Sequence, residues 1–330
     1  MKSKLRHGLF AAASAAMLAF GVAAGHVQAV QAQPAELTKI AVSIPPSIFA
    51  LPAYVGIDQG LFEEAGFDVD LVPAMSGPES VSLLLSGQLQ FAFIDIHNAV
   101  LGVANGLPVV VSIPYAVSAE QMPADGIGFG NLLVMTNSGI NSPADLEGKT
   151  IGTNSIGGSA QLDYVDALTA AGVKVDRIKW VEVPSQRQLP ALRQGQIDGV
   201  TVAEPHGAVA RAEGDVKVII TADAAMGGAP VFGLISQKDW AQQNRELILK
   251  LQQVYFKAAE MIASDRSVAE KALIERLRVP AGIAPEVRLP HFATAPFTAE
   301  ATKPVADRLV RTGAITQDKL PDLSALYVTP

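Results

Sequence analysis

Hydrophobic and polar residues follow a helix, glycine, strand order that occurs twice in the chain. The segment Leu85–Asp95 (LSGQLQFAFID) is echoed by Leu192–Val202 (LRQGQIDGVTV), with Gly87 aligned to Gly195. Each copy is typical of the end of an apolar-striped helix, a glycine that stops it, and a short buried strand. The pattern therefore predicts two similar α/β halves.

The same alternation extends through most of the chain, with glycine or proline between the elements. In the first half it predicts strands at 37–43, 67–72, 91–94 and 107–113 and helices at 53–59 and 76–87. In the second half it predicts strands at 150–153, 178–183, 199–202 and 216–221 and helices at 162–171 and 186–193. This order favours an α/β fold of two lobes rich in parallel strands.

Two apolar, strand-like segments are candidates for the crossings between the lobes. We expect the chain to cross at 131–136 and to return at 230–236, and the helix predicted at 246–264 to pack on the first lobe. The predicted domains are lobe 1 at 37–131 plus 231–330 and lobe 2 at 132–230. Two crossings make a hinge, and a hinge beside a crevice suits closure on a small solute.

The first residues have the pattern of a secretory leader. Lys2, Lys4 and Arg6 precede an uncharged, alanine-rich run, which predicts a signal peptide at 1–32 with cleavage after Ala29 or Ala32. No later stretch approaches the roughly 20 apolar residues that span a bilayer. We therefore expect an extracytoplasmic location, most simply a bacterial periplasm.

The net charge and the lack of cysteine exclude several classes of function. Without the three basic residues of the leader, 22 Lys and Arg face 32 Asp and Glu, a net charge of −10, which argues against nucleic acid as a partner. The sequence has no cysteine, which excludes a disulfide scaffold, a thiol nucleophile and a thiolate metal site.

Four further motifs follow one another in order. They are Gly60–Gly66 (GLFEEAG), the phrase ending at Asp95, Asp145–Gly152 (DLEGKTIG), and Gln194–Asp198 (QGQID) continuing to Glu204-Pro205. Their succession resembles the periplasmic solute-binding proteins of the nitrate/sulfonate/taurine and thiamine-pyrimidine group. The resemblance implies the type II periplasmic-binding fold, a role in import beside an ABC permease and its ATPase, and no chemistry on the ligand.

In open α/β sheets ligands bind where strands end, so the turns that follow the predicted strands are candidates for ligand contact. The candidate ligand-binding residues in these turns are Pro45, Ser47, Ile48, Ser76, Gly77, Asp95, His97, Ser155, Gly157, Gly158, Ser159, Gln161, Glu204, His206 and Gly228.

These candidates would bind by different chemistry. The segment 155–161 opens a helix, so its free N–H groups suit an oxyanion, although an ordinary capped helix start has the same residues. Asp95 and Glu204 end matched strands and could hold an amine or aminopyrimidine from opposite lobes. The alternatives are a helix cap for Asp95 and a local or interlobe ion pair for Glu204.

The histidines do not have metal-ligand spacing. His97 and His206 follow matched strands, but no His-x-His or His-x-x-x-His pattern occurs, so we expect neither a metal nor a cofactor. Hydrogen bonding in the crevice is expected for His206 before His97, which could equally pack against neighbouring helices. Tyr115, Phe129 and Phe232 are explained as well by packing as by ligand contact.

None of the candidate turns contains Lys or Arg. The turns are 43–48, 76–80, 95–98, 155–161, 204–207 and 225–230. A dianion would ordinarily require such a residue, whereas a monoanion can be held by helix N-termini and hydroxyls. The predicted ligand is a sulfonate-, taurine- or nitrate-like solute, or alternatively a thiamine-pyrimidine-like or other amine-bearing heterocycle.

The leading prediction is a monomeric solute-binding component of an ABC transporter, with a small-molecule ligand and a permease in the inner membrane as partners. Two other classes remain open. One is an enzyme on the same fold, which would need a nucleophile, metal cluster or cofactor loop that the sequence does not display. The other is a subunit that senses the ligand and reports to a membrane receptor.

Overall fold

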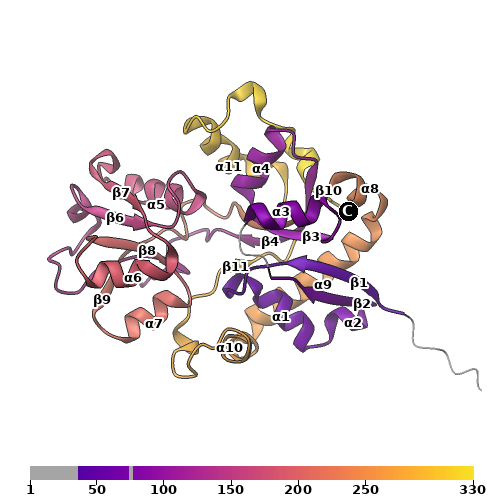
Figure 1. Ribbon diagram of the computed structural model, residues 1–330, viewed down its shortest axis with the longest axis horizontal. Coiled ribbons are helices and arrows are strands. Elements are labelled where there is room, and N and C mark those ends of the chain that lie inside the picture. Colours follow the sequence, from indigo (N-terminus) through magenta and orange to yellow (C-terminus); the bar gives the residue numbers. More distant parts are fainter. Residues whose placement is uncertain (1–35, 74–76) are drawn as a thin grey trace, which may run out of the picture. The chain divides into compact units, whose positions relative to one another are not determined.

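The chain forms two β-sheets with helices packed around them (Figure 1). The structure is a computed structural model that describes residues 36–73 and 77–330. The leader and Ser76 lie outside these residues. Among the described helices, none combines the length and the apolar character needed to cross a membrane.

The first sheet has six strands in the order β11-β4-β10-β3-β1-β2. Its strands are β1 (Thr38–Ser43), β2 (Phe67–Leu71), β3 (Phe91–Asp95), β4 (Val109–Val117), β10 (Pro230–Gln237) and β11 (His291–Phe292). β1 pairs in parallel with β2 and β3, whereas β10 runs antiparallel to both β3 and β4. β4 is buried along nearly its whole length, as its continuous apolar sequence requires.

The second sheet has five strands in the order β7-β6-β8-β5-β9. Its strands are β5 (Gly130–Met135), β6 (Thr150–Thr153), β7 (Lys179–Glu182), β8 (Gly199–Ala203) and β9 (Val216–Thr221). Again one strand, β5, runs antiparallel to its two neighbours. The two similar α/β halves are confirmed, but both sheets are mixed. The strand that follows each change of sheet, β5 or β10, runs antiparallel to its neighbours, and the short β11 also runs antiparallel to β4.

Helices surround both sheets. They are α1 (Leu51–Asp58), α2 (Leu61–Glu64), α3 (Gly77–Leu85), α4 (Ile96–Ala104), α5 (Ser159–Ala170), α6 (Ser185–Arg193), α7 (His206–Ala212), α8 (Lys238–Gln243), α9 (Arg245–Ser264), α10 (Arg266–Glu275) and α11 (Ala299–Arg311). α1, α9 and α10 pack together beside the first sheet (Figure 1). α11 packs against α4. We call the part built on the first sheet lobe 1 and the part built on the second sheet lobe 2.

The repeated sequence phrase folds into the same motif in both lobes. α3 and α6 each end in a Schellman turn, in which Gly87 and Gly195 adopt φ of +77° and +68°. In lobe 1 the N–H of Gln88 donates to the carbonyl of Leu83, and in lobe 2 the N–H of Gln196 donates to that of Ala191, both at 3.0 Å. These turns return the chain into β3 and β8, the central parallel strands of their sheets.

The crossings between the lobes lie before the strands that the sequence analysis assigned to them. Gly130 and Asn131 already pair within the second sheet and Pro230 within the first, so the chain changes sheets in 118–129 and 222–229. These two segments run side by side, because the N–H of Ser118 donates to the carbonyl of Ala229 and the N–H of Gly228 to that of Ala119. The strand assignments were correct, but their role as linkers was wrong.

One buried side chain joins the two crossings. Asp223 is 6% exposed, and its carboxylate accepts hydrogen bonds from the N–H groups of Phe129 at 2.7 Å and Gly130 at 3.1 Å. Its carbonyl accepts from the Ser118 hydroxyl at 2.6 Å. A Cβ on Gly128 would lie 2.1 Å from the Asp223 carboxylate, so the close approach requires glycine at this position.

The core of lobe 1 includes the apolar stripe expected on the long helix. Leu251, Val254, Ala258 and Ile262 of α9 are buried against α1, and Leu247 is half-buried. Because this stripe recurs every three or four residues, it covers one face of the helix and leaves the polar face to solvent.

The two Schellman glycines give a direct test of the repeated motif. We expect Gly87→Ala and Gly195→Ala each to lower the free energy of unfolding by about 1 kcal/mol, since a β-carbon disfavours positive φ. Gly282→Ala is the control, because Gly282 has ordinary φ and open space around it. Urea denaturation would contradict the assignment if all three variants were equally stable.

Candidate functional site

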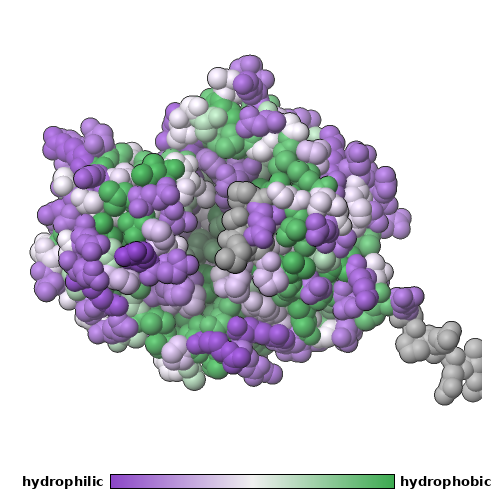
Figure 2. Space-filling view, viewed as in Figure 1, coloured by the Kyte–Doolittle hydropathy of each residue, from purple (hydrophilic) through white to green (hydrophobic). Residues whose placement is uncertain are grey.

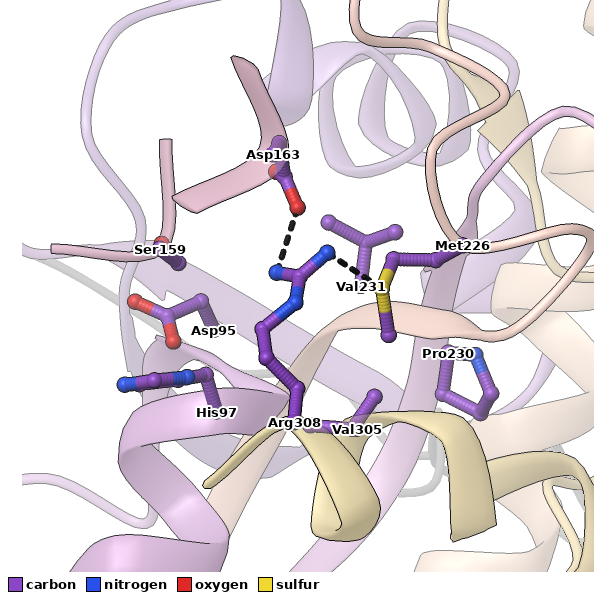
Figure 3. Close-up of a pocket in the computed structure, with 9 residues that line it drawn as sticks. All are labelled: Asp95, His97, Ser159, Asp163, Met226, Pro230, Val231, Val305 and Arg308. Carbon is purple, nitrogen blue, oxygen red and sulfur yellow. Dashed lines mark hydrogen bonds and ion pairs between the residues drawn. The ribbon is translucent and has the colours of Figure 1, made fainter. Parts of the chain in front are cut away.

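A pocket lies where the two lobes meet, beside the ends of β3 and α5 (Figure 3). Its empty volume is about 260 Å³, counting the part that is open to solvent. The lining residues are Asp95, His97, Ser159, Asp163, Met226, Pro230, Val231, Val305 and Arg308. They come from both lobes and from the return crossing. Figure 2 shows the surface hollowed between the lobes, with hydrophobic residues in its depth.

Asp95 is the N-cap of α4, as one of its two alternative roles anticipated. Its Oδ1 accepts the N–H of Asn98 at 2.8 Å and its Oδ2 accepts the Asn98 amide at 2.6 Å. Ser159 of lobe 2 lines the pocket beside this carboxylate (Figure 3). Burial raises the pKa of Asp95, while these hydrogen bonds and nearby His97 oppose the rise.

His97 is the buried polar group of the pocket that retains binding capacity. The side chain is 6% exposed, and its Nδ1 has no hydrogen-bond partner within the described residues. Burial lowers its pKa, Asp95 raises it, and Arg308 lowers it further. A neutral imidazole is therefore favoured, and its unpaired nitrogen can bond a ligand.

An arginine that the sequence analysis did not consider forms one wall of the pocket. The side chain of Arg308, on α11, is 3% exposed, and its Nη1 lies 2.6 Å from Asp163 Oδ1. Its Nε lies 2.9 Å from Asp166 Oδ2, and its Nη2 contacts the sulfur of Met226. The candidate turns do lack basic residues, but the pocket has a cation that comes from a helix outside those turns.

The candidate residues of the first strand-to-helix turn, at 45–48, have mainly structural roles. Ser47 caps the 3₁₀ turn η1 (Ile48–Ala50), accepting the N–H of Phe49 at 3.3 Å, and Pro45 is exposed. Ile48 is 0% exposed within the lobe 1 core, so its side chain is not available to a ligand. Ile48 was expected to contact a ligand, but it is an apolar residue just before α1 and packs into the core instead. Gly77 is exposed at the start of α3.

The turn before α5 is stabilised by a hydrogen bond between its own residues. The N–H of Gly157 donates to Gln161 Oε1 at 2.6 Å, and Gln161 is buried. Ser155 and Gly157 are exposed, Gly158 is the N-cap residue, and only Ser159 of this segment lines the pocket. Ligand contact by this turn stays a prediction.

Glu204 is held by a local ion pair, the alternative left open above. Its Oε1 lies 2.7 Å from Arg211 Nη1, and its Oε2 accepts the N–H of Ala208 at 2.9 Å. Burial raises the pKa of Glu204, and Arg211 opposes the rise. Because the Glu204 side chain is also 0% exposed, an amine ligand has no access to this carboxylate in this conformation. His206 is exposed at the start of α7. The N–H of Gly228 donates to the carbonyl of Ala119 and so joins the two crossings.

Four half-buried phenylalanines lie together next to the crossing. Phe49 contacts Phe232, Phe129 and Phe93 with ring centroids 4.4, 5.7 and 5.8 Å apart, and Phe93 stacks on Phe232 at 5.0 Å. Phe232 pairs with Asp95 across β10 and β3, so the aromatic group adjoins the polar pocket. Tyr115 is a core residue, 2% exposed. Within the described residues, no group of three or more acidic or histidine side chains could hold a metal.

Comparison with known proteins identifies the family. Residues 48–267 match the model of the family described as NMT1/THI5 like. The chain belongs to the NMT1/THI5-like family. The resemblance inferred from its motifs is thus confirmed.

Relatives of this NMT1/THI5-like chain include named binding proteins. A putative binding protein of Brucella abortus is 28% identical over 151 residues, 46% of this chain and 43% of the relative. This match covers less than half of the relative's length. The formylaminopyrimidine-binding protein of Halalkalibacterium halodurans is 24% identical over 67% of this chain and 64% of its own.

The fold of this NMT1/THI5-like protein is similar to that of a solved structure of another protein. The periplasmic aliphatic sulphonate binding protein SsuA from Escherichia coli superposes with a TM-score of 0.72 at 19% identity. The alignment covers 89% of this chain and 92% of SsuA. The type II periplasmic-binding fold is confirmed.

The Asp163 carboxyl should titrate well above its usual range. Burial raises its pKa to about 6, although Arg308 opposes the rise. We expect carbon-detected NMR to find this midpoint and Arg308→Gln to move it higher. Since the folded-state pKa exceeds the unfolded one, the group's contribution to stability is present at low pH and is lost as pH rises through about 6. Asp163→Asn should remove that loss. A midpoint near that of exposed Asp145 would contradict the burial.

Glu204 should act on stability rather than on ligand binding. We expect Glu204→Gln to lower the free energy of unfolding by about 1–3 kcal/mol, because Arg211 then loses its buried charge partner. Asp215→Asn, which weakens the more exposed pair with Arg193, is the control and should have a smaller effect. A Glu204→Gln variant of full stability that fails to bind a solute would reverse the assignment.

Proposed function

We propose that this protein is the extracytoplasmic solute-binding component of an ABC importer that captures a small organic solute by closing its two lobes. The observation that carries the proposal is the pocket at the lobe boundary, where buried His97 keeps an unpaired nitrogen and which Asp95 and Arg308 also line. Membership of a family whose relatives are named binding proteins supports the same role.

The location and partners follow from this role. The leader at 1–32 would direct the chain through the inner membrane, after which the mature protein would act as a monomer in the periplasm. Its partners would be the solute and an ABC permease, with no reaction on the ligand. The predicted mechanism is a population shift, in which contacts made only in the closed conformation draw the hinge equilibrium toward closure.

Two ligand classes fit different parts of the site. A sulfonate-, taurine- or nitrate-like head is supported by the SsuA fold relative and by the N-terminus of α5. An amine-bearing heterocycle is supported by the carboxylates of Asp95 and Asp163, which suit an amine, and by the four phenylalanines, which suit a flat ring. The formylaminopyrimidine-binding relative points to the second class.

Binding to a solute panel tests the proposal. We expect mass spectrometry of the denatured, freshly purified protein to reveal a bound small molecule, and calorimetry to detect saturable binding of one among taurine, methanesulfonate, nitrate and 4-aminopyrimidine. His97→Ala should weaken that binding by about tenfold, the usual loss for one hydrogen bond.

His206→Ala is the matched control, because His206 is exposed and outside the pocket. Equal losses in the two histidine variants would place the ligand elsewhere in the crevice. A protein that carries no small molecule and binds none of the panel would contradict the proposed function.

A further inference from the structure

Arg308 joins the two lobes through its charge. It projects from α11 of lobe 1 toward Asp163 of lobe 2 (Figure 3). Its second acidic partner, Asp166, lies one turn after Asp163 on α5. The side chain of Arg308 is 3% exposed, and those of Asp163 and Asp166 are 24% and 18% exposed. These three side chains, which we call the latch, form a charged contact that is largely removed from water.

The latch lies on the side of the hinge that faces the crevice. Asp95 at the end of β3 and Ser159 at the start of α5 line the same pocket as Asp163 and Arg308, so the latch lies where the end of a lobe 1 strand meets a lobe 2 helix (Figure 3). Val231 and Val305 line the same pocket, in which the Arg308 side chain is 3% exposed. Rotation of the lobes away from each other would therefore part α5 from α11 and hydrate all three charges.

Neighbouring Arg311 makes a similar contact in a different environment. It also projects from α11 and lies 2.9 Å from Asp166, but its side chain is 62% exposed. An exposed pair is screened by water and contributes little, whereas removing one member of a buried pair leaves its partner's charge without compensation. We therefore expect the buried Arg308 to stabilise lobe closure more than the exposed Arg311 does.

We propose that Arg308 is a positioning residue that latches the two lobes in the closed conformation through Asp163 and Asp166. The inference rests on the proposed function, in that closure around a solute is the motion the latch controls. Arg308 sets how much of the ligand-free protein is closed. Since apparent affinity scales with the fraction in the binding-competent conformation, the latch tunes affinity and release without touching the solute.

The interlobe distance of the ligand-free protein tests the latch. The chain has no cysteine, so Lys179→Cys on β7 and Lys271→Cys on α10 provide unique spin-label sites on exposed positions of the two lobes. At about pH 8, where the Asp163 carboxyl is charged, we expect Arg308→Gln to shift the distance distribution by lowering the closed-to-open ratio at least about tenfold. Arg311→Gln should leave the distribution unchanged.

Three companion variants separate a latch from simple structural support. Arg308→Lys should restore part of the closed population, because it keeps the charge. Asp163→Asn with Asp166→Asn should open the protein as Arg308→Gln does, and it decides the question if Arg308→Gln fails to fold. Adding Asp163→Asn to Arg308→Gln should open the protein no further, since the interaction is already lost.

The outcomes are distinct from those of the ligand panel. A folded Arg308→Gln protein with an unchanged distance distribution would overturn the latch, as would equal opening by Arg311→Gln. If one of the panel solutes binds, its dissociation should be faster from Arg308→Gln than from the unsubstituted protein. If none binds, the proposed function fails while the distance measurement still decides the latch.

Discussion

The arrangement of the two lobes depends on the buried carboxylate of Asp223. Two chain segments that are about a hundred residues apart must run together between the sheets, and each brings backbone N–H groups that need partners away from water. Asp223 supplies acceptors to the first crossing from its position on the second. Burial raises the pKa of this carboxyl, and the N–H groups of Phe129 and Gly130 oppose the rise. The contact thus favours the charged carboxylate at the point where the chain twice leaves one sheet for the other.

This joint also explains the mixed sheets and the position of the aromatic group. Because both crossings pass through one narrow place, the strand after each crossing enters its new sheet in the middle, antiparallel to its neighbours. The hydrogen bond from Phe129 to Asp223 holds that ring at the start of lobe 2, against Phe49 of lobe 1, which in turn contacts Phe232. The hinge and one wall of the crevice are therefore built from the same residues.

The framework could be predicted from sequence because it depends on local periodicity. The glycines of the repeated phrase mark the helix ends, and the apolar runs locate most strands of both sheets to within about two residues. The exceptions are β4, which continues four residues past its predicted end, and the two-residue β11, which was not predicted. Strand direction could not be predicted, since an antiparallel central strand has the same apolar pattern as a parallel one. The partner of Glu204 could not be chosen either, because a carboxylate that follows a strand suits a ligand and a local arginine equally well.

The site was only partly predictable because its charged wall comes from a distant helix. Asp95, His97 and Ser159 were found from their positions after strands, whereas Arg308 lies on α11, about 145 residues from Asp163. A signal was nevertheless present in the sequence. Val305, Ala306 and Leu309 form the buried face of α11, and Arg308 falls on that face rather than on the polar one. Arginine is rarely buried without an acidic partner. A basic residue within an apolar stripe therefore indicates a carboxylate from another element, and here that element belongs to the opposite lobe.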